Sequence, residues 1–68
     1  MRLTINGDAR ELPAGATVAQ AVAALGVPVE ERGVAVALDA EVVPRGRWSD
    51  TLLAEGARLE VVRAAAGG

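Results

Sequence analysis

Hydrophobic and polar residues alternate at the start of the chain, over residues 2–6, with the two-residue period of a half-buried β-strand. Asn6-Gly7 closes this stretch. This pair strongly favours a type I′ hairpin turn, because both central positions of that turn need a positive φ. A second strand over residues 9–12 can pair back. The pattern therefore predicts that the chain opens with a β-hairpin.

The next hydrophobic pattern has helical spacing and defined ends. Thr17 is a good N-cap, and Gln20 three residues later completes a capping box. The apolar residues that share one face are Val18, Ala21, Val22 and Leu25. Gly26 supplies the left-handed position after the helix, and Pro28 prevents its continuation. We predict a helix over residues 18–25, too short to be stable in water unless it packs against a sheet.

The second half of the chain predicts three more strands. Residues 34–38 are apolar and mostly β-branched or small, Asp39-Ala40 can turn the chain, and residues 41–43 can pair back. Pro44 ends this pairing and indicates an edge strand.

The remainder of this half contains one irregular segment and the final strand. Residues 45–50 are expected to be irregular, and Leu52 and Leu53 are expected to fill the open end of the core. A turn follows at residues 55–57, and the last strand covers residues 58–63.

The order of elements predicts an α+β fold. A mixed sheet of about five strands would carry one helix on one face, with the last strand beside and parallel to the first, and the crossover right-handed. This is the β-grasp, or ubiquitin-like, arrangement. We expect a single domain over residues 1–63 and a flexible C-terminal Gly-Gly tail over residues 64–68. The predicted core is Leu3, Ile5, Leu12, Val18, Val22, Leu25, Val36, Leu38, Leu52, Leu59 and Val61.

Composition excludes most side-chain chemistry. The 68 residues contain no Cys, His or Lys, so thiolate, imidazole and Schiff-base sites are missing, and we expect no metal site. A net charge of −2 with one aromatic residue argues against nucleic acid as a partner. The uncharged run over residues 12–29 is broken by Pro and Gly, which argues against a membrane span. Without a signal-peptide pattern, the expected location is cytoplasmic.

The final residues suggest where the function lies. After Arg63 no side chain is larger than a methyl group, and the chain ends in Gly67-Gly68. One hypothesis is that the last strand delivers the Gly68 carboxylate as the working group. The alternative is an ordinary ragged terminus or a linker remnant, because terminal glycines also occur by chance.

The whole chain resembles ThiS, the family of small sulfur carriers of thiazole (thiamin) biosynthesis. The resemblance rests on Asn6-Gly7, LPAGATVAQ at residues 12–20, VAVAL at 34–38, EVVPR at 41–45, Trp48, LAEG at 53–56, LEVVRA at 59–64 and the terminal Gly67-Gly68. There are three departures from the family pattern. Asp39-Ala40 replaces the usual Asn-Gly, Ala57 replaces an Asp, and Ala66 replaces a frequent Gln.

The resemblance implies a carrier and not an enzyme. A ubiquitin-activating-like (ThiF-like) enzyme would use ATP and Mg to adenylate the Gly68 carboxylate. Sulfur from a cysteine desulfurase or another donor would then give a thiocarboxylate for a ThiG-like thiazole synthase. No cofactor would be bound by the chain itself. The alternatives that remain open are a carrier for molybdopterin or cysteine synthesis, a ubiquitin-like protein modifier, and a plain interaction module.

Strand parity indicates a second surface of interest. Val62 should point away from the helix, near Thr4 and Ala37, and an apolar outer sheet face is a possible partner-binding face. Trp48 is expected to cover the core, and three arginines of the second half of the chain are expected at a solvated surface. These are Arg45, Arg47 and Arg58.

Overall fold

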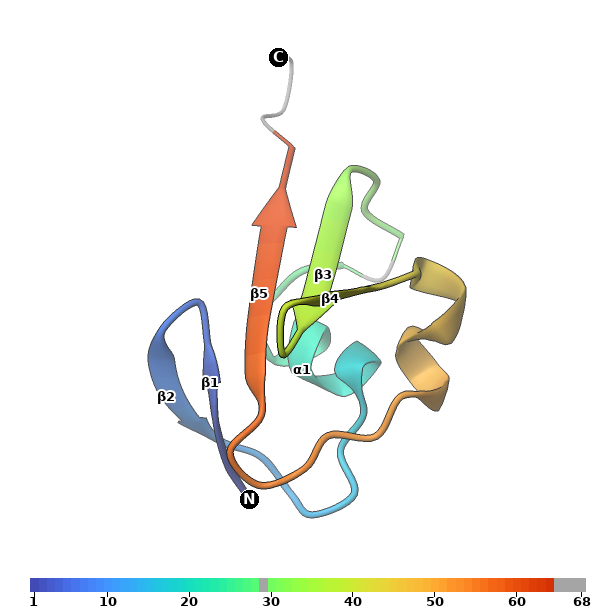
Figure 1. The fold of residues 1–68 in the computed structure, drawn as a ribbon. Helices are drawn as coiled ribbons and strands as arrows, with labels where there is room; N and C mark the ends of the chain where they lie inside the picture. Colours follow the sequence, from blue (N-terminus) through green and yellow to red (C-terminus); the bar gives the residue numbers. More distant parts are fainter. Residues whose placement is uncertain (29, 65–68) are drawn as a thin grey trace.

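The fold is a mixed sheet with one α-helix, as predicted. A computed structural model of the chain describes residues 1–28 and 30–64. In chain order its elements are β1 (Arg2–Ile5), β2 (Asp8–Glu11), α1 (Val18–Ala24), β3 (Val34–Leu38), β4 (Glu41–Val43), the 3-10 helix η1 (Arg45–Asp50) and β5 (Arg58–Arg63). Among the described residues the strands form one five-stranded sheet in the order β2-β1-β5-β3-β4 (Figure 1). The last strand, β5, is therefore the central one, parallel to β1 and antiparallel to β3.

The opening hairpin turns at the predicted pair. Asn6 and Gly7 have φ values of 53° and 85°, and Ile5 pairs with Asp8. The Asn6 side chain also contacts β5, which the sequence did not indicate. Its Nδ2 donates to the Val61 carbonyl (3.2 Å), and its Oδ1 accepts from the Val61 N–H (2.8 Å). This amide continues the β1–β5 pairing after the backbone of β1 has turned away.

The helix has both predicted ends. The Thr17 Oγ1 accepts from the Gln20 N–H (3.2 Å), and the Gln20 Oε1 accepts from the Thr17 N–H (2.8 Å), so the capping box is complete. Leu25 is the C-cap, and Gly26 follows with a φ of 82°. Because a residue with a Cβ is disfavoured at such a φ, the glycine fixes the point where the helix stops.

The turn between β3 and β4 contains no glycine. Asp39 and Ala40 adopt φ values of 50° and 73°, in the left-handed region that is costly for L-residues. Part of the cost is offset because the Asp39 carboxylate accepts a hydrogen bond from the Arg58 N–H (3.0 Å). The Asp39 N–H also donates to the Arg58 carbonyl (2.8 Å). The turn is thus tied to the start of the central strand.

Two expectations for residues 45–53 are wrong. Residues 45–50 form the 3-10 helix η1 and are not irregular. Leu52 is 67% exposed, and only Leu53 enters the core. Leu52 forms an isolated bridge with Thr17 in an extended backbone, where neighbouring side chains point to opposite sides. Only one of the two leucines can therefore face inward.

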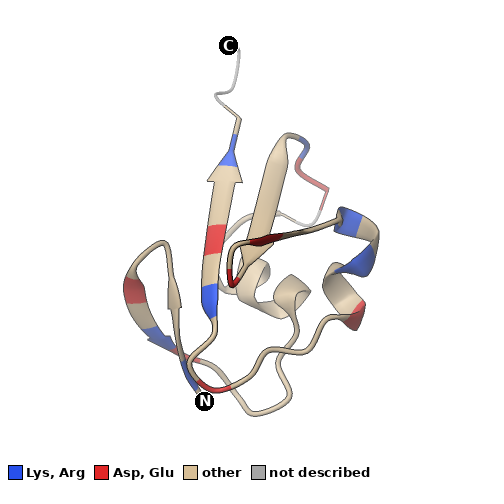
Figure 2. Cartoon of the chain, in the orientation of Figure 1, with Lys and Arg blue, Asp and Glu red and all other residues tan. Residues whose placement is uncertain are grey.

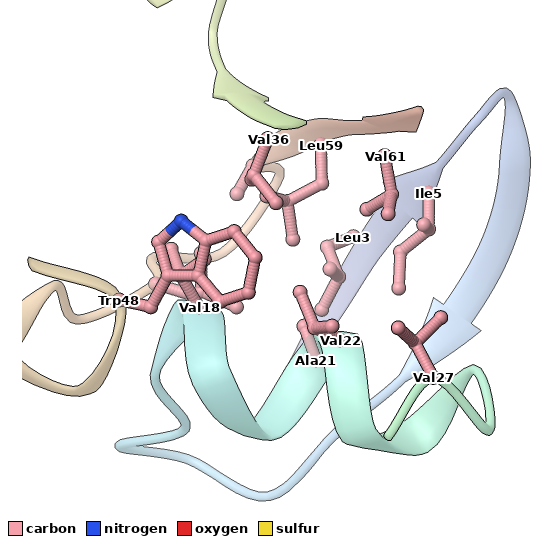
Figure 3. Close-up of a cluster of buried hydrophobic side chains, with 12 residues drawn as sticks. Leu3, Ile5, Val18, Ala21, Val22, Val27, Val36, Trp48, Leu59 and Val61 are labelled. Carbon is pink, nitrogen blue, oxygen red and sulfur yellow. The ribbon is translucent and has the colours of Figure 1, made fainter. Parts of the chain in front are cut away.

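One hydrophobic cluster lies between α1, η1 and the inner face of the sheet (Figure 3). Leu12, Leu25 and Leu38, which we expected inside, are only partly buried at its rim. Trp48 is buried, and its indole N–H donates to the Val43 carbonyl (2.8 Å). The buried cluster consists of Leu3, Ile5, Val18, Ala21, Val22, Val27, Val36, Trp48, Leu53, Ala57, Leu59 and Val61. It includes small residues such as Ala21 and Ala57 that a search for large apolar side chains overlooks.

Candidate functional site

The end of the chain and the surface around it form the candidate site. Gly67 and Gly68, the predicted working residues, lie outside the described residues, as does most of the predicted tail. The structure does describe the point from which they continue. The central strand β5 runs away from the N-terminus to one end of the sheet and ends at Arg63, with Ala64 following (Figure 1).

A backbone hydrogen bond holds Ala64 beside the start of β3. The Ala64 N–H donates to the Gly33 carbonyl (2.7 Å), one position beyond the last pair of the β3–β5 ladder, Val34 with Arg63. Gly33 has a φ of 75°, and a Cβ built on it would lie 2.8 Å from the Ala64 Cβ. The close approach of the two segments, at Gly33 and at Ala64, thus requires glycine at residue 33.

An ion pair holds the preceding residue. The Arg63 guanidinium donates to both carboxylate oxygens of Glu31, from Nε (2.6 Å) and from Nη2 (2.5 Å). The Arg63 side chain is half exposed, and that of Glu31 is one quarter exposed. The side-chain hydrogen bond and the charge of Arg63 hold the pKa of Glu31 below its ordinary value of 4.5, with a smaller contribution from Arg45. The same pair raises the pKa of Arg63.

Arg45 connects the loop that carries Glu31 to the body of the fold. Its guanidinium donates to the Glu31 carbonyl and lies 4.5 Å from the centroid of the Trp48 ring. Trp48 in turn belongs to the core. Arg45 is exposed, as expected, and it also holds the loop through these two contacts. Sequence reasoning could not find the Glu31–Arg63 pair, because nothing local marks two residues 32 positions apart as neighbours.

The outer sheet face places Val62 where parity predicted, 62% exposed, but with different neighbours. Val62 lies opposite Ala35 in the β3–β5 ladder. Ala37 lies opposite Glu60, and Thr4 lies opposite Arg58 near the start of β5. Val62 and Thr4 are therefore at different ends of the central strand.

Charged residues occur at both ends and in the middle of β5 (Figure 2). A hollow of about 540 Å³ lies beside the first half of β5. It is lined by Thr4, Gly7, Asp39, Ala40, Arg58, Leu59 and Glu60. Near the other end of β5, the exposed side chain of Val62 is apolar. Val42, which lies opposite Ala37 on β4, is 76% exposed. Val62 thus lies one residue before the end of β5, whereas Val42 lies level with Glu60 in the middle of the strand.

The described residues contain no cluster of side chains that could hold a metal ion. Over residues 1–28 and 30–64, no three His, Cys, Asp or Glu residues gather as metal ligands would, and no polar or charged residue is buried. No helix in this part of the chain combines the length and hydrophobicity needed to cross a membrane.

Comparison with known proteins gives matches in sequence and in fold. The sequence model of the ThiS family matches residues 3–68. A curated relative, the thiazole synthase of Paramagnetospirillum magneticum (strain ATCC 700264 / AMB-1), is 37% identical over 68 residues. That match covers all of this chain but 20% of the relative, so the chain spans about a fifth of the relative's length.

Two solved structures share the fold along the whole chain. The crystal structure of the thiamine biosynthesis protein (ThiS) from Geobacter metallireducens is 28% identical, with a TM-score of 0.80 and full coverage of both chains. The NMR structure of a thiamine biosynthesis protein from the same organism is also 28% identical. It has a TM-score of 0.79, and the match covers all of this chain and 88% of the other.

Proposed function

This chain belongs to the ThiS family, and from that premise we propose that it is a protein sulfur carrier whose working group is the Gly68 carboxylate. The observation that carries the proposal is that the family match extends through residue 68 and so includes both terminal glycines. The absence of Cys, His and Lys supports it, because the usual nucleophiles and bases are not available.

The proposed chemistry has three steps. The Gly68 carboxylate attacks ATP on an activating enzyme with bound Mg²⁺, forming an acyl adenylate and releasing pyrophosphate. The terminal sulfur of a donor persulfide then displaces AMP from the carbonyl carbon. A second thiol cleaves the remaining S–S bond and is oxidised to a disulfide, which leaves a thiocarboxylate on Gly68.

The glycines suit the first step for a physical reason. A carboxylate is a poor electrophile, so an enzyme must enclose it closely to activate it. Glycine lets a backbone approach where a Cβ would clash. Because the partners use ATP, the proposed place of action is the cytoplasm.

The thiazole pathway is the proposed destination of the sulfur. The 37% identical relative is described as a thiazole synthase, which supports a synthase of this kind as the acceptor partner. A carrier for another sulfur pathway would share the chemistry at Gly68 and differ only in its acceptor. A protein modifier would instead join Gly68 to a lysine of a target.

Mass spectrometry after reaction with a thiamin-pathway activating enzyme, ATP, Mg²⁺ and a persulfide donor tests the proposal. We expect a mass increase equal to the difference between one sulfur and one oxygen, located on Gly68 by fragmentation. Deleting Gly68 or making Gly67→Val should abolish adenylation, since the first shortens the tail and the second adds a β-branched side chain.

Arg10→Ala, on the exposed strand β2, is the control and should react like the wild type. Sulfur uptake by the Gly68-deleted chain at the wild-type rate would refute the carrier role. Transfer of the labelled sulfur to a thiazole synthase, tested against acceptors of the other pathways, decides the destination.

A further inference from the structure

The loop of residues 30–33 holds the exit of the central strand at two adjacent residues. The Gly33 carbonyl accepts from the Ala64 N–H, and the Glu31 carboxylate binds the Arg63 guanidinium. Arg45 fixes the loop itself by donating to the Glu31 carbonyl. Both contacts lie outside the hydrophobic cluster, at the end of the β3–β5 ladder.

We infer that Glu31 and Gly33 are positioning residues that fix the point at which the chain leaves the sheet, and thus the reach and direction of Gly68 towards the activating enzyme. This inference rests on the function proposed above. Gly68 is four residues beyond the anchored Ala64, and four residues can span at most about 14 Å.

Loss of the anchor would change that reach. Each residue of β5 released from β3 would add about 3.5 Å to the longest possible span and enlarge the volume that the Gly68 carboxylate could reach. The activating enzyme would then pay more conformational entropy to bind the carboxylate. Once the carboxylate is bound, the adenylation chemistry is the same. The anchor should therefore affect the KM for the carrier and leave kcat unchanged.

Glu31 and Gly33 fit this role in different ways. The Glu31–Arg63 pair is partly exposed, and such pairs add little to global stability, so its removal should leave the fold intact. Gly33 cannot be replaced without moving Ala64, because of its φ and the 2.8 Å approach of the added Cβ. A substitution of Glu31 should therefore disturb the position of Ala64 mildly, and a substitution of Gly33 should disturb it strongly.

The kinetic test compares Glu31→Gln with Glu30→Gln in adenylation by the activating enzyme. Glu30 is an exposed neighbour that forms no ion pair with any described residue, so its variant removes the same charge without the contact. We expect Glu31→Gln to raise KM about twofold to fivefold, with kcat and the melting temperature unchanged. Glu30→Gln should match the wild type.

A double-mutant cycle separates the pair from the individual side chains. Arg63→Gln should raise KM as Glu31→Gln does, and the double variant should be no worse than either single one, because both remove the same contact. Additive effects, or equal KM values for Glu31→Gln and Glu30→Gln, would overturn the positioning role.

Amide hydrogen exchange of the free carrier gives a readout that does not involve the enzyme. We expect the Ala64 N–H to exchange faster in Glu31→Gln and faster still in Gly33→Ala, while the Val36 amide in β3 stays protected. A raised KM with unchanged exchange at Ala64 would mean that Glu31 contacts the enzyme directly, and would overturn the inference. A wild type that is not adenylated at all would refute the proposed function and this inference together.

Discussion

At the scale of single residues, Asn6 combines a turn conformation with a side-chain bridge to the central strand. Its φ of 53° suits Asn or Gly, and its amide satisfies both backbone groups of Val61. We predict that Asn6→Gly, which keeps the turn, lowers the free energy of unfolding by about 1–2 kcal/mol, since two partly buried groups lose their partner. Asn6→Ala should cost about 1 kcal/mol more, because alanine is strained at this φ. Urea unfolding measures both, and wild-type stability of Asn6→Gly would contradict the bridging role.

Neighbouring valines on β5 face opposite sides of the sheet. Val61 is 8% exposed and belongs to the core, whereas Val62 is 62% exposed. We predict that Val61→Asp lowers the free energy of unfolding by about 3 kcal/mol or more, because it buries a charge without a partner. Val62→Asp should change it by less than about 0.5 kcal/mol and should instead weaken binding to the activating enzyme. Thermal melts and a binding assay on both variants separate the effects, and the opposite ranking in the melts would refute this register.

The Glu31–Arg63 pair makes the exit of β5 sensitive to acid. Because the pKa of Glu31 is lowered from 4.5, the pair is intact above that pH and is lost as the pH falls through the lowered value. An NMR titration of the Glu31 carboxyl carbon should therefore give a midpoint below 4.5 in the wild type. In Arg63→Ala the midpoint should rise, since the hydrogen bond and the nearby charge are both removed. An unchanged midpoint in that variant would show that Arg63 does not set it.

At the scale of elements, the β3–β4 turn stores strain that can be removed. Ala40 has a φ of 73°, where glycine pays no steric cost. We predict that Ala40→Gly raises the free energy of unfolding by about 0.5–1 kcal/mol, the relief of strain exceeding the added entropy of the unfolded chain. Ala35→Gly, at an exposed position inside β3, is the matched control and should lower it by about 0.5–1 kcal/mol. Chemical denaturation of both variants tests the contrast, and destabilisation by Ala40→Gly would contradict it.

At the scale of the whole molecule, a single cluster joins the helix, the 3-10 helix and the sheet. We predict one cooperative unfolding transition, because no segment within residues 1–28 and 30–64 has a core of its own. Trp48 is the one aromatic residue of the sequence and lies in the core, so its fluorescence reports tertiary packing alone. Its midpoint in urea should coincide with that of the far-UV circular dichroism. A fluorescence transition that precedes the loss of secondary structure would reveal an intermediate.

The sequence by itself determined the elements whose causes are local. Asn6-Gly7 dictates the first turn, and Thr17 with Gln20 dictates the start of α1. The strands predicted over residues 34–38, from their apolar side chains, and over residues 58–63 have the bounds of β3 and β5. These features depend on φ preferences, capping and side-chain period, which act over a few residues. The proposal that Gly67 and Gly68 are the working residues also came from the sequence, and the family match includes both of them.

Only the tertiary structure decided which distant residues meet. The amide of Asn6 reaches Val61 across 55 positions, and Glu31 reaches Arg63 across 32. The choice of Leu53 over Leu52 for the core likewise depends on how the chain passes Thr17. No local preference fixes such contacts, because they exist only once β5 has inserted between β1 and β3. The anchoring of the chain at Ala64 is a consequence of that insertion.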